Sequence, residues 1–147
     1  MSGGQIEHCT IVSNRVTKSA GLGGGVYQAG GTIVNTIAYY NWIAGAAVPV
    51  RNIQAASGKL NVGNSCATEL AYDPEGTGNI NGDPQFVNPG KSDWRLAQDS
   101  PCINAAVMLP WSADGYDITS GPRRRGVRAD IGAYETQRMR TTVLLLR

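Results

Sequence analysis

Charged side chains are scarce in this sequence, and one histidine and one phenylalanine occur in 147 residues. Lys, Arg, Asp and Glu make up only 16% of the chain, which disfavours a charged helical bundle, while 19 glycines favour a turn-rich β architecture. The formal net charge of +2 is too small to indicate a nucleic-acid partner. No apolar run is long enough to span a bilayer, so no membrane span is expected.

Ligands for a metal ion are also scarce. Cys9, Cys66 and Cys102 are too few for a disulfide framework, and His8 is the single histidine. No cluster of metal ligands results, and the sequence predicts neither a metal nor a cofactor. Cys9 is expected to be a small buried residue, with the adjacent His8 on the opposite, outward face of its strand. That alternation excludes a Cys9–His8 nucleophilic pair.

Two loops have features of ligand-binding loops but lack the residues that complete them. The glycine-rich stretch 21–25 is not followed by Lys-Ser, Lys-Thr or a helical segment, so it predicts a sharp corner and not a phosphate site. The stretch 73–79 has oxygen-bearing residues at alternate positions, as in a calcium loop, but Pro84 stands where the closing glutamate would be. A polar surface loop is therefore expected there.

A repeat organises the first half of the chain. Residues 6–14 (IEHCTIVSN) and 33–41 (IVNTIAYYN) are both β-branched and apolar, and both end in asparagine. They align at a spacing of 27 positions, which is typical of one coil of a solenoid. A short strand is expected at 25–28, and a more irregular third coil at 48–53 and 59–66. One domain of 147 residues is predicted, with coils over residues 1–72.

The second half predicts a lid for this stack. Residues 73–135 place short apolar runs between turns, as in GDPQFVNPG (82–90) and DWRL (93–96), which is too interrupted for a helix and too apolar for a linker. We expect an irregular C-terminal cap over 73–135 and a β-prone apolar tail over 136–147. Asp83 and Asp93 are expected to cap backbone N–H groups in its turns.

Four motifs of the cap resemble the C-terminal element of bacterial right-handed parallel β-helix proteins of the choice-of-anchor type, within the pectin-lyase-like superfamily. They are NINGDPQFV (79–87), WRL (94–96), SPCIN (100–104) and ADIGAYE (129–135). The resemblance implies an all-β fold, a short right-handed parallel β-helix of about three coils with an irregular C-terminal cap. Such relatives are secreted or on the cell surface and are longer, so this chain is expected to correspond to their C-terminal portion; it shows no signal peptide, and its location stays open. A Cys66–Cys102 bridge is one option in an export-type fold.

The expected function is non-catalytic: a structural or ligand-presenting module that self-associates through its uncovered first coil and is associated with carbohydrate or the cell surface. The alternative is a fragment or subunit of a polysaccharide-processing lyase or glycoside hydrolase, because β-helices often host such enzymes. The coils carry few carboxylates, so catalytic residues stay unknown. A homo-oligomer and a polysaccharide or other polyanion are the expected partners.

Two groups of residues are candidate ligand-binding residues. Tyr40 and Trp42 fall two positions apart, so on one strand they would share a face that can stack on sugar rings, although packing is the more common role of such aromatics. Arg123, Arg124 and Arg125 could bind a polyanion, or could form ion pairs with carboxylates such as Asp117.

Overall fold

The computed structural model describes residues 3–18, 22–45, 51–72 and 78–136. These residues form a mostly β protein with parallel sheets and three short 3₁₀ helices. We call the described part of 3–72 the stacked region and 78–136 the C-terminal region. The stacked region contains β1 Gln5–Glu7, β2 Thr10–Val12, β3 Arg15–Val16, β4 Val26–Gln28, β5 Thr32–Val34, β6 Ile37–Tyr39, β7 Trp42–Ile43, β8 Ile53–Ala55, β9 Val62–Gly63 and the helix η1 Thr68–Tyr72.

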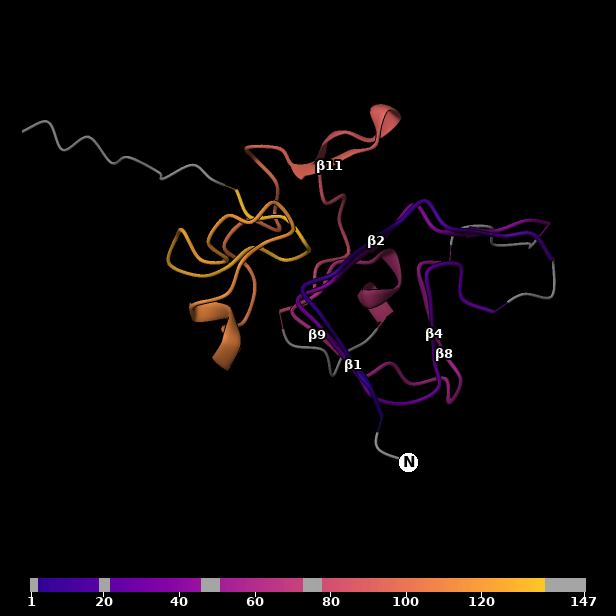
Figure 1. Ribbon diagram of the computed structural model, residues 1–147. Helices are drawn as coiled ribbons and strands as arrows, with labels where there is room; N and C mark the ends of the chain where they lie inside the picture. The colour runs from indigo at the N-terminus through magenta and orange to yellow at the C-terminus, as the bar shows by residue number, and fades with distance from the viewer. Residues whose placement is uncertain (1–2, 19–21, 46–50, 73–77, 137–147) are drawn as a thin grey trace, which may run out of the picture.

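Strands that are one repeat apart in the stacked region lie directly on one another. The first layer, β1 to β4, pairs in parallel with the second layer, β5 to β8, and in β1 Ile6 lies beside Ile33. The 27-residue repeat predicted from the sequence is therefore confirmed as the register of the sheets. Figure 1 views this region nearly end-on, so that β4 and β8 follow the same path. The next layer is shorter: β9 pairs with β5, and Cys66 forms a bridge with Ile37.

Left-handed backbone positions mark the corners and recur after 27 residues between the first two layers and after 29 residues in the third. His8, Asn35 and Asn64 have φ of 47°, 52° and 45°, and Ser13 and Tyr40 have φ of 57° and 56°. Asparagine adopts this conformation more readily than most residues, which explains its place at the corners.

The predicted glycine corner is also confirmed. A Cβ on Gly24 would lie 2.6 Å from the carbonyl oxygen of Arg51, so only glycine allows the two layers to approach this closely.

An asparagine ladder runs through the stack. The backbone N–H and Nδ2 of Asn14 both donate to Oδ1 of Asn41, and the same two groups of Asn41 donate to Oδ1 of Asn52. The ladder ends at η1, where the backbone N–H of Asn52 donates to Oε1 of Glu69 and its Nδ2 to Oγ1 of Thr68. In Figure 1, η1 crosses the middle of the stack outline, and Leu70 packs into the core cluster of Ile33 and Ile53.

The C-terminal region is irregular. It contains β10 Phe86–Asn88, η2 Pro89–Lys91, β11 Asp93–Leu96 and η3 Pro110–Ala113. β10 and β11 form an antiparallel hairpin, and Ile80 bridges to Cys66 at the end of the stack. A second core cluster joins Ile37 and Cys66 of the stack to Cys102 and Ile131. Asp83 and Asp93 accept backbone N–H groups from Gln85 and Arg95, as the sequence predicts.

Candidate functional site

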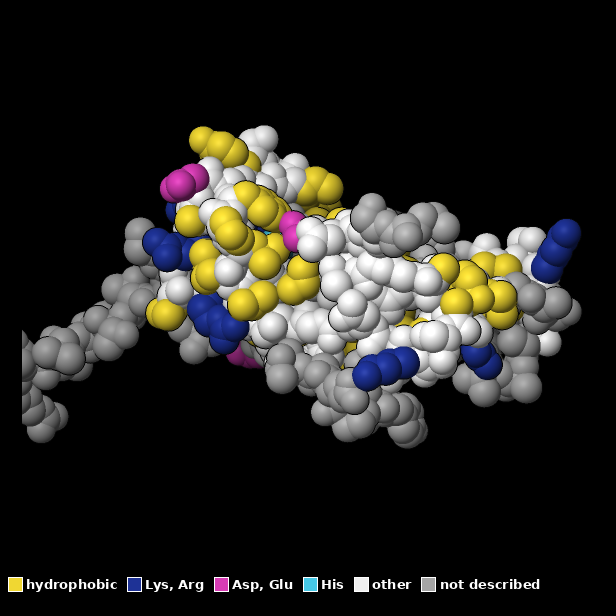
Figure 2. Space-filling view, turned by 90° about the horizontal axis from the view of Figure 1, so that it is seen from below, with side chains coloured by type: hydrophobic (Ala, Val, Ile, Leu, Met, Phe, Trp, Pro, Cys, Tyr) yellow, Lys and Arg dark blue, Asp and Glu magenta, His cyan; other side chains and the backbone are white. Residues whose placement is uncertain are grey.

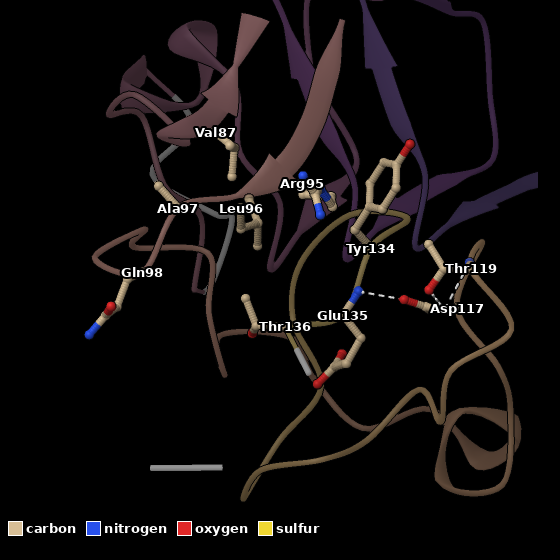
Figure 3. A pocket seen from close by; sticks show the side chains of 10 residues that line it. All are labelled: Val87, Arg95, Leu96, Ala97, Gln98, Asp117, Thr119, Tyr134, Glu135 and Thr136. Atoms are coloured by element: carbon tan, nitrogen blue, oxygen red, sulfur yellow. Dashed lines mark hydrogen bonds between the residues drawn. The ribbon is translucent and has the colours of Figure 1, made fainter. Parts of the chain in front are cut away.

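The C-terminal region holds a pocket of about 580 Å³ (Figure 3). One wall comes from the hairpin, with Val87 and Arg95, and from the residues that follow it. The facing wall comes from the turn at Asp117 and from the segment that carries Tyr134 and Glu135. Because these walls are up to 49 positions apart in sequence, the pocket exists only when the whole C-terminal region is folded.

Asp117 organises the turn at the base of this pocket. Its Oδ1 accepts hydrogen bonds from the backbone N–H and Oγ1 of Thr119, at 2.9 and 2.7 Å, and from the N–H of Gly121. Its Oδ2 accepts the N–H of Glu135 at 3.0 Å. Burial alone would raise the pKa of Asp117, but these donors outweigh it and hold the pKa below its usual value. Asp117 is therefore an ionised carboxylate whose two oxygens both accept hydrogen bonds from the surrounding turn and from Glu135.

Glu135 has the opposite electrostatics. Its side chain is only 6% exposed, and this burial raises its pKa to about 7, with the Asp130 carboxylate contributing in the same direction. Backbone N–H groups of Asp130 and Arg125 oppose the shift by donating to Glu135. The pocket wall thus combines one ionised carboxylate with one that is partly protonated at neutral pH, a combination that enzymes use for acid and base roles.

The side chains of Arg95, Gln98 and Thr119 are the exposed polar groups of the pocket and can reach a ligand. Arg95 is held by Asp93 through Nε at 2.8 Å and Nη2 at 2.5 Å, and Figure 3 shows it beside Tyr134. Gln98 and Thr119 also line the pocket. An aromatic ring with amide, hydroxyl and guanidinium groups around it can bind a hydroxylated ligand.

The arginine run predicted as a polyanion site is divided by the fold. Arg123 is 2% exposed and donates through Nη1 to the carbonyl of Ala133 at 3.0 Å and through Nη2 to the carbonyls of His8 and Gly132. Arg123 therefore anchors the C-terminal region to the first layer and cannot meet a polymer. Arg124 and Arg125 are exposed, and on the face drawn in Figure 2 the Lys and Arg side chains lie scattered along the molecule.

The aromatic pair Tyr40 and Trp42 is also separated. Tyr40 lies at the left-handed corner between β6 and β7, so the expectation that it shares a strand face with Trp42 is wrong. Its ring packs near Phe86 and Trp94 of the hairpin, at 6.4 and 6.3 Å between centroids. Trp42 lies under the guanidinium of Arg15, 4.2 Å from its ring. Both aromatics thus have packing partners inside the protein.

His8 differs from its expected outward, exposed position. It is 5% exposed because Trp111 of η3 packs on it edge-to-face at 5.3 Å, while the Trp111 indole donates to Glu7. Nε2 of His8 lies 2.9 Å from Nδ2 of Asn35, and Nδ1 has no partner among the described residues. Cys9, expected to be buried, is partly exposed because it lies in the first layer.

No family model, curated protein or solved structure matches this chain. The site must therefore be interpreted from its own geometry. Within the described ranges, no helix is long and apolar enough to cross a membrane, and no three His, Cys, Asp or Glu side chains are grouped to hold a metal ion.

Other expectations fall on residues that the structure does not describe. The loop weighed as a calcium site lies largely at 73–77, and the apolar tail lies almost wholly at 137–147. The pocket itself was not predicted. Its motif 129–135 was prominent in the sequence, but nothing local indicated that Glu135 would line a pocket together with hairpin residues.

Proposed function

We propose that the chain is a non-catalytic structural module: a short right-handed parallel β-helix of about three coils, closed by an irregular C-terminal cap and self-associating through its first coil. The parallel in-register layers support the β-helix, and right-handed connections are by far the most common between parallel strands. The resemblance of residues 79–135 to the cap of choice-of-anchor β-helix proteins supports the same assignment.

The observation that carries the proposal is the difference in burial between the first two layers. Ile33, Ile43 and Ile53 of the second layer are at most 2% exposed, whereas their partners Ile6, Val16 and Val26 in the first layer are only half-buried. β1 to β4 also pair on one side only in the described residues. Such an edge exposes apolar side chains and unpaired backbone groups, which favours pairing with another chain.

The opposite end of the stack is more fully covered in the described residues. β7 and β8 also pair on one side only, but their Ile43 and Ile53 are buried, and η1 and Glu69 terminate the asparagine ladder. Two copies would therefore meet through the same open face, as in a two-fold symmetric dimer.

Light scattering coupled to size-exclusion chromatography tests this association. Ile11 is half-buried in the first layer, so Ile11→Lys should place a charge in the interface and convert a dimer into a monomer with an unchanged circular dichroism spectrum. The control is Val127→Lys, at an 88% exposed loop position, which should remain a dimer. A stable dimer has a dissociation constant far below about 100 μM, so a wild-type chain that is monomeric at this concentration would contradict the proposal.

A carbohydrate-related role is the second candidate, either presentation of a glycan or a contribution to a polysaccharide-processing enzyme. The pocket supports it through the Tyr134 ring, the exposed Arg95 and Gln98, and the opposed pKa shifts of Asp117 and Glu135. As an enzyme, Glu135 would be the proton donor. As a binding module, Tyr134 would stack on a sugar ring and Arg95 would bind its hydroxyl or carboxylate groups.

A glycan array and a reducing-sugar assay on pectin-type and alginate-type polymers separate these roles. Binding that is lost in Tyr134→Ala and Arg95→Ala, but kept in Arg124→Ala, would place the glycan in the pocket. Release of reducing ends that Glu135→Gln abolishes would identify an enzyme. Binding unchanged by the pocket variants and lost in Arg124→Ala would instead identify the exposed arginines as the site.

A further inference from the structure

Cys66 and Cys102 lie together where the stacked region meets the C-terminal region. Cys66 is at the end of the stack, bridged to Ile37 on one side and Ile80 on the other. Cys102 lies 36 positions later, and both residues are 0% exposed within one core cluster. Burial of both thiols in a single cluster is a consequence of tertiary folding, because no local element connects them.

Both cysteines are free thiols buried in one core cluster, and Sγ of Cys66 also contacts the carbonyl of Gly82 at 3.4 Å. The backbone around each is fixed by its own hydrogen bonds: the N–H of Cys66 donates to Thr36 and its carbonyl accepts from Ala38, both at 2.9 Å. The carbonyl of Cys102 accepts the N–H of Ile131 at 2.9 Å. Two buried thiols in one cluster, held on fixed backbones, are the pair of cysteines that a disulfide can join in this fold.

The third cysteine has a different environment. Cys9 is partly exposed in the first layer, and its Sγ contacts the carbonyl of Glu7 at 3.3 Å. It is not part of the cluster that contains Cys66 and Cys102. The fold therefore brings only Cys66 and Cys102 together among the three cysteines. Cys9 should stay a free thiol and serves as the control for non-specific oxidation.

We propose that Cys66 and Cys102 form a disulfide bond that covalently joins the C-terminal region to the end of the stack. A thiolate of one cysteine attacks the disulfide of an oxidant such as oxidised glutathione, giving a mixed disulfide and one reduced thiol. The second cysteine then attacks the protein sulfur of the mixed disulfide and releases the second oxidant thiol. The protein loses two protons and two electrons, and the oxidant gains them.

Burial sets the order of events. A solvent oxidant cannot reach either sulfur in the folded chain, because both residues are 0% exposed. The interaction with Cys102 and burial also raise the pKa of the Cys66 thiol, which further slows exchange in the folded state. The bond therefore forms during folding, before residues 100–104 close over Cys66, and resists reduction afterwards.

Refolding of the full chain tests the proposal directly. The reduced, denatured protein is refolded with mixed reduced and oxidised glutathione, or with dithiothreitol alone, and free thiols are then alkylated under denaturing conditions. We expect one alkylated cysteine after the glutathione refolding, Cys9, and a disulfide-linked peptide pair containing Cys66 and Cys102 on non-reducing mass spectrometry. The dithiothreitol sample should carry three alkylated cysteines.

Thermal unfolding supplies an independent measurement. Closing a loop of this length should raise the Tm of the oxidised chain by about 10 °C over the reduced chain. Cys9→Ser should retain both the linked peptides and the Tm difference. Because the oxidised and reduced chains have the same sequence at Cys66 and Cys102, the comparison does not require a substitution in the core. Three free thiols after glutathione refolding, a bridge that includes Cys9, or equal Tm values for the two forms would overturn the proposal.

Discussion

Replacement of Asn41 by alanine tests the contribution of the asparagine ladder to stability. The Asn41 side chain is fully buried and makes four hydrogen bonds. Its Oδ1 accepts from the N–H and Nδ2 of Asn14, at 3.0 and 2.9 Å, and its Nδ2 donates to the carbonyl of Ile11 at 2.7 Å and to Oδ1 of Asn52 at 3.2 Å. Asn41→Ala removes all four.

The magnitude follows from these partners. A hydrogen bond contributes roughly 1 kcal/mol net, and a buried group left without a partner costs more than an exposed one. The Asn14 groups regain water because that residue is exposed, and Oδ1 of Asn52 keeps the N–H of Asn41. The expected loss in the free energy of unfolding is therefore about 3 to 4 kcal/mol, a large part of the stability of a typical domain.

Urea unfolding followed by circular dichroism measures this loss, and Asn14→Ala is the matched control. Asn14 has the same residue type at the adjacent layer, but its side chain donates only one hydrogen bond and is exposed, so its replacement should cost under about 1 kcal/mol. Equal losses for the two variants would refute the idea that the buried rung of the ladder stabilises the stack.

Three further variants test the buried titratable groups and the close approach of the layers. The pKa of His8 is lowered to about 4, first by burial and then by Arg123, so the contribution of His8 to stability should fall by up to about 3 kcal/mol as pH drops from 6.5 to 4. The pKa of Glu135 is raised to about 7, so the contribution of Glu135 should fall by up to about 3 kcal/mol as pH rises from 4.5 to 7, and the two contributions oppose each other in the wild type. In pH-dependent urea unfolding, His8→Asn, which suits the left-handed corner, should therefore leave a stability that falls as pH rises, and Glu135→Gln one that falls as pH drops; a variant with the wild-type pH profile would contradict the corresponding prediction. Gly24→Ala should lower the Tm by several degrees, because its Cβ would meet the Arg51 carbonyl, whereas Gly30→Ala, with open space around its Cβ, should change it little.

The sequence predicted the repeating part of the fold because that part depends on local chemistry. Strand residues at 6–14 and 33–41 are largely β-branched and apolar, so the 27-residue spacing translates directly into the observed register. The asparagines that end these segments are not the left-handed residues: Ser13 and Tyr40, one position earlier, adopt that conformation, and Asn14 and Asn41 form the ladder instead. The same reasoning found the glycine corner at Gly24, where two backbones approach each other.

The candidate site was not predicted, because its properties come from contacts distant in sequence. Arg123 belongs to a run of three arginines that suggests an exposed basic patch, yet it is buried by carbonyl groups of His8 and of residues 132–133. The burial of His8 likewise depends on Trp111, which follows it by more than one hundred positions. Neither contact leaves a periodic trace in the sequence.

The asparagine ladder also gives the stack a direction. Hydrogen bonds run from Asn14 through Asn41 and Asn52 toward Glu69, while Nδ2 of Asn41 also donates back to the carbonyl of Ile11 in the first layer. The outermost oxygen, Oδ1 of Asn14, lacks a donor among the described residues. A second copy that docks on the first layer could donate a hydrogen bond to this oxygen and so extend the ladder.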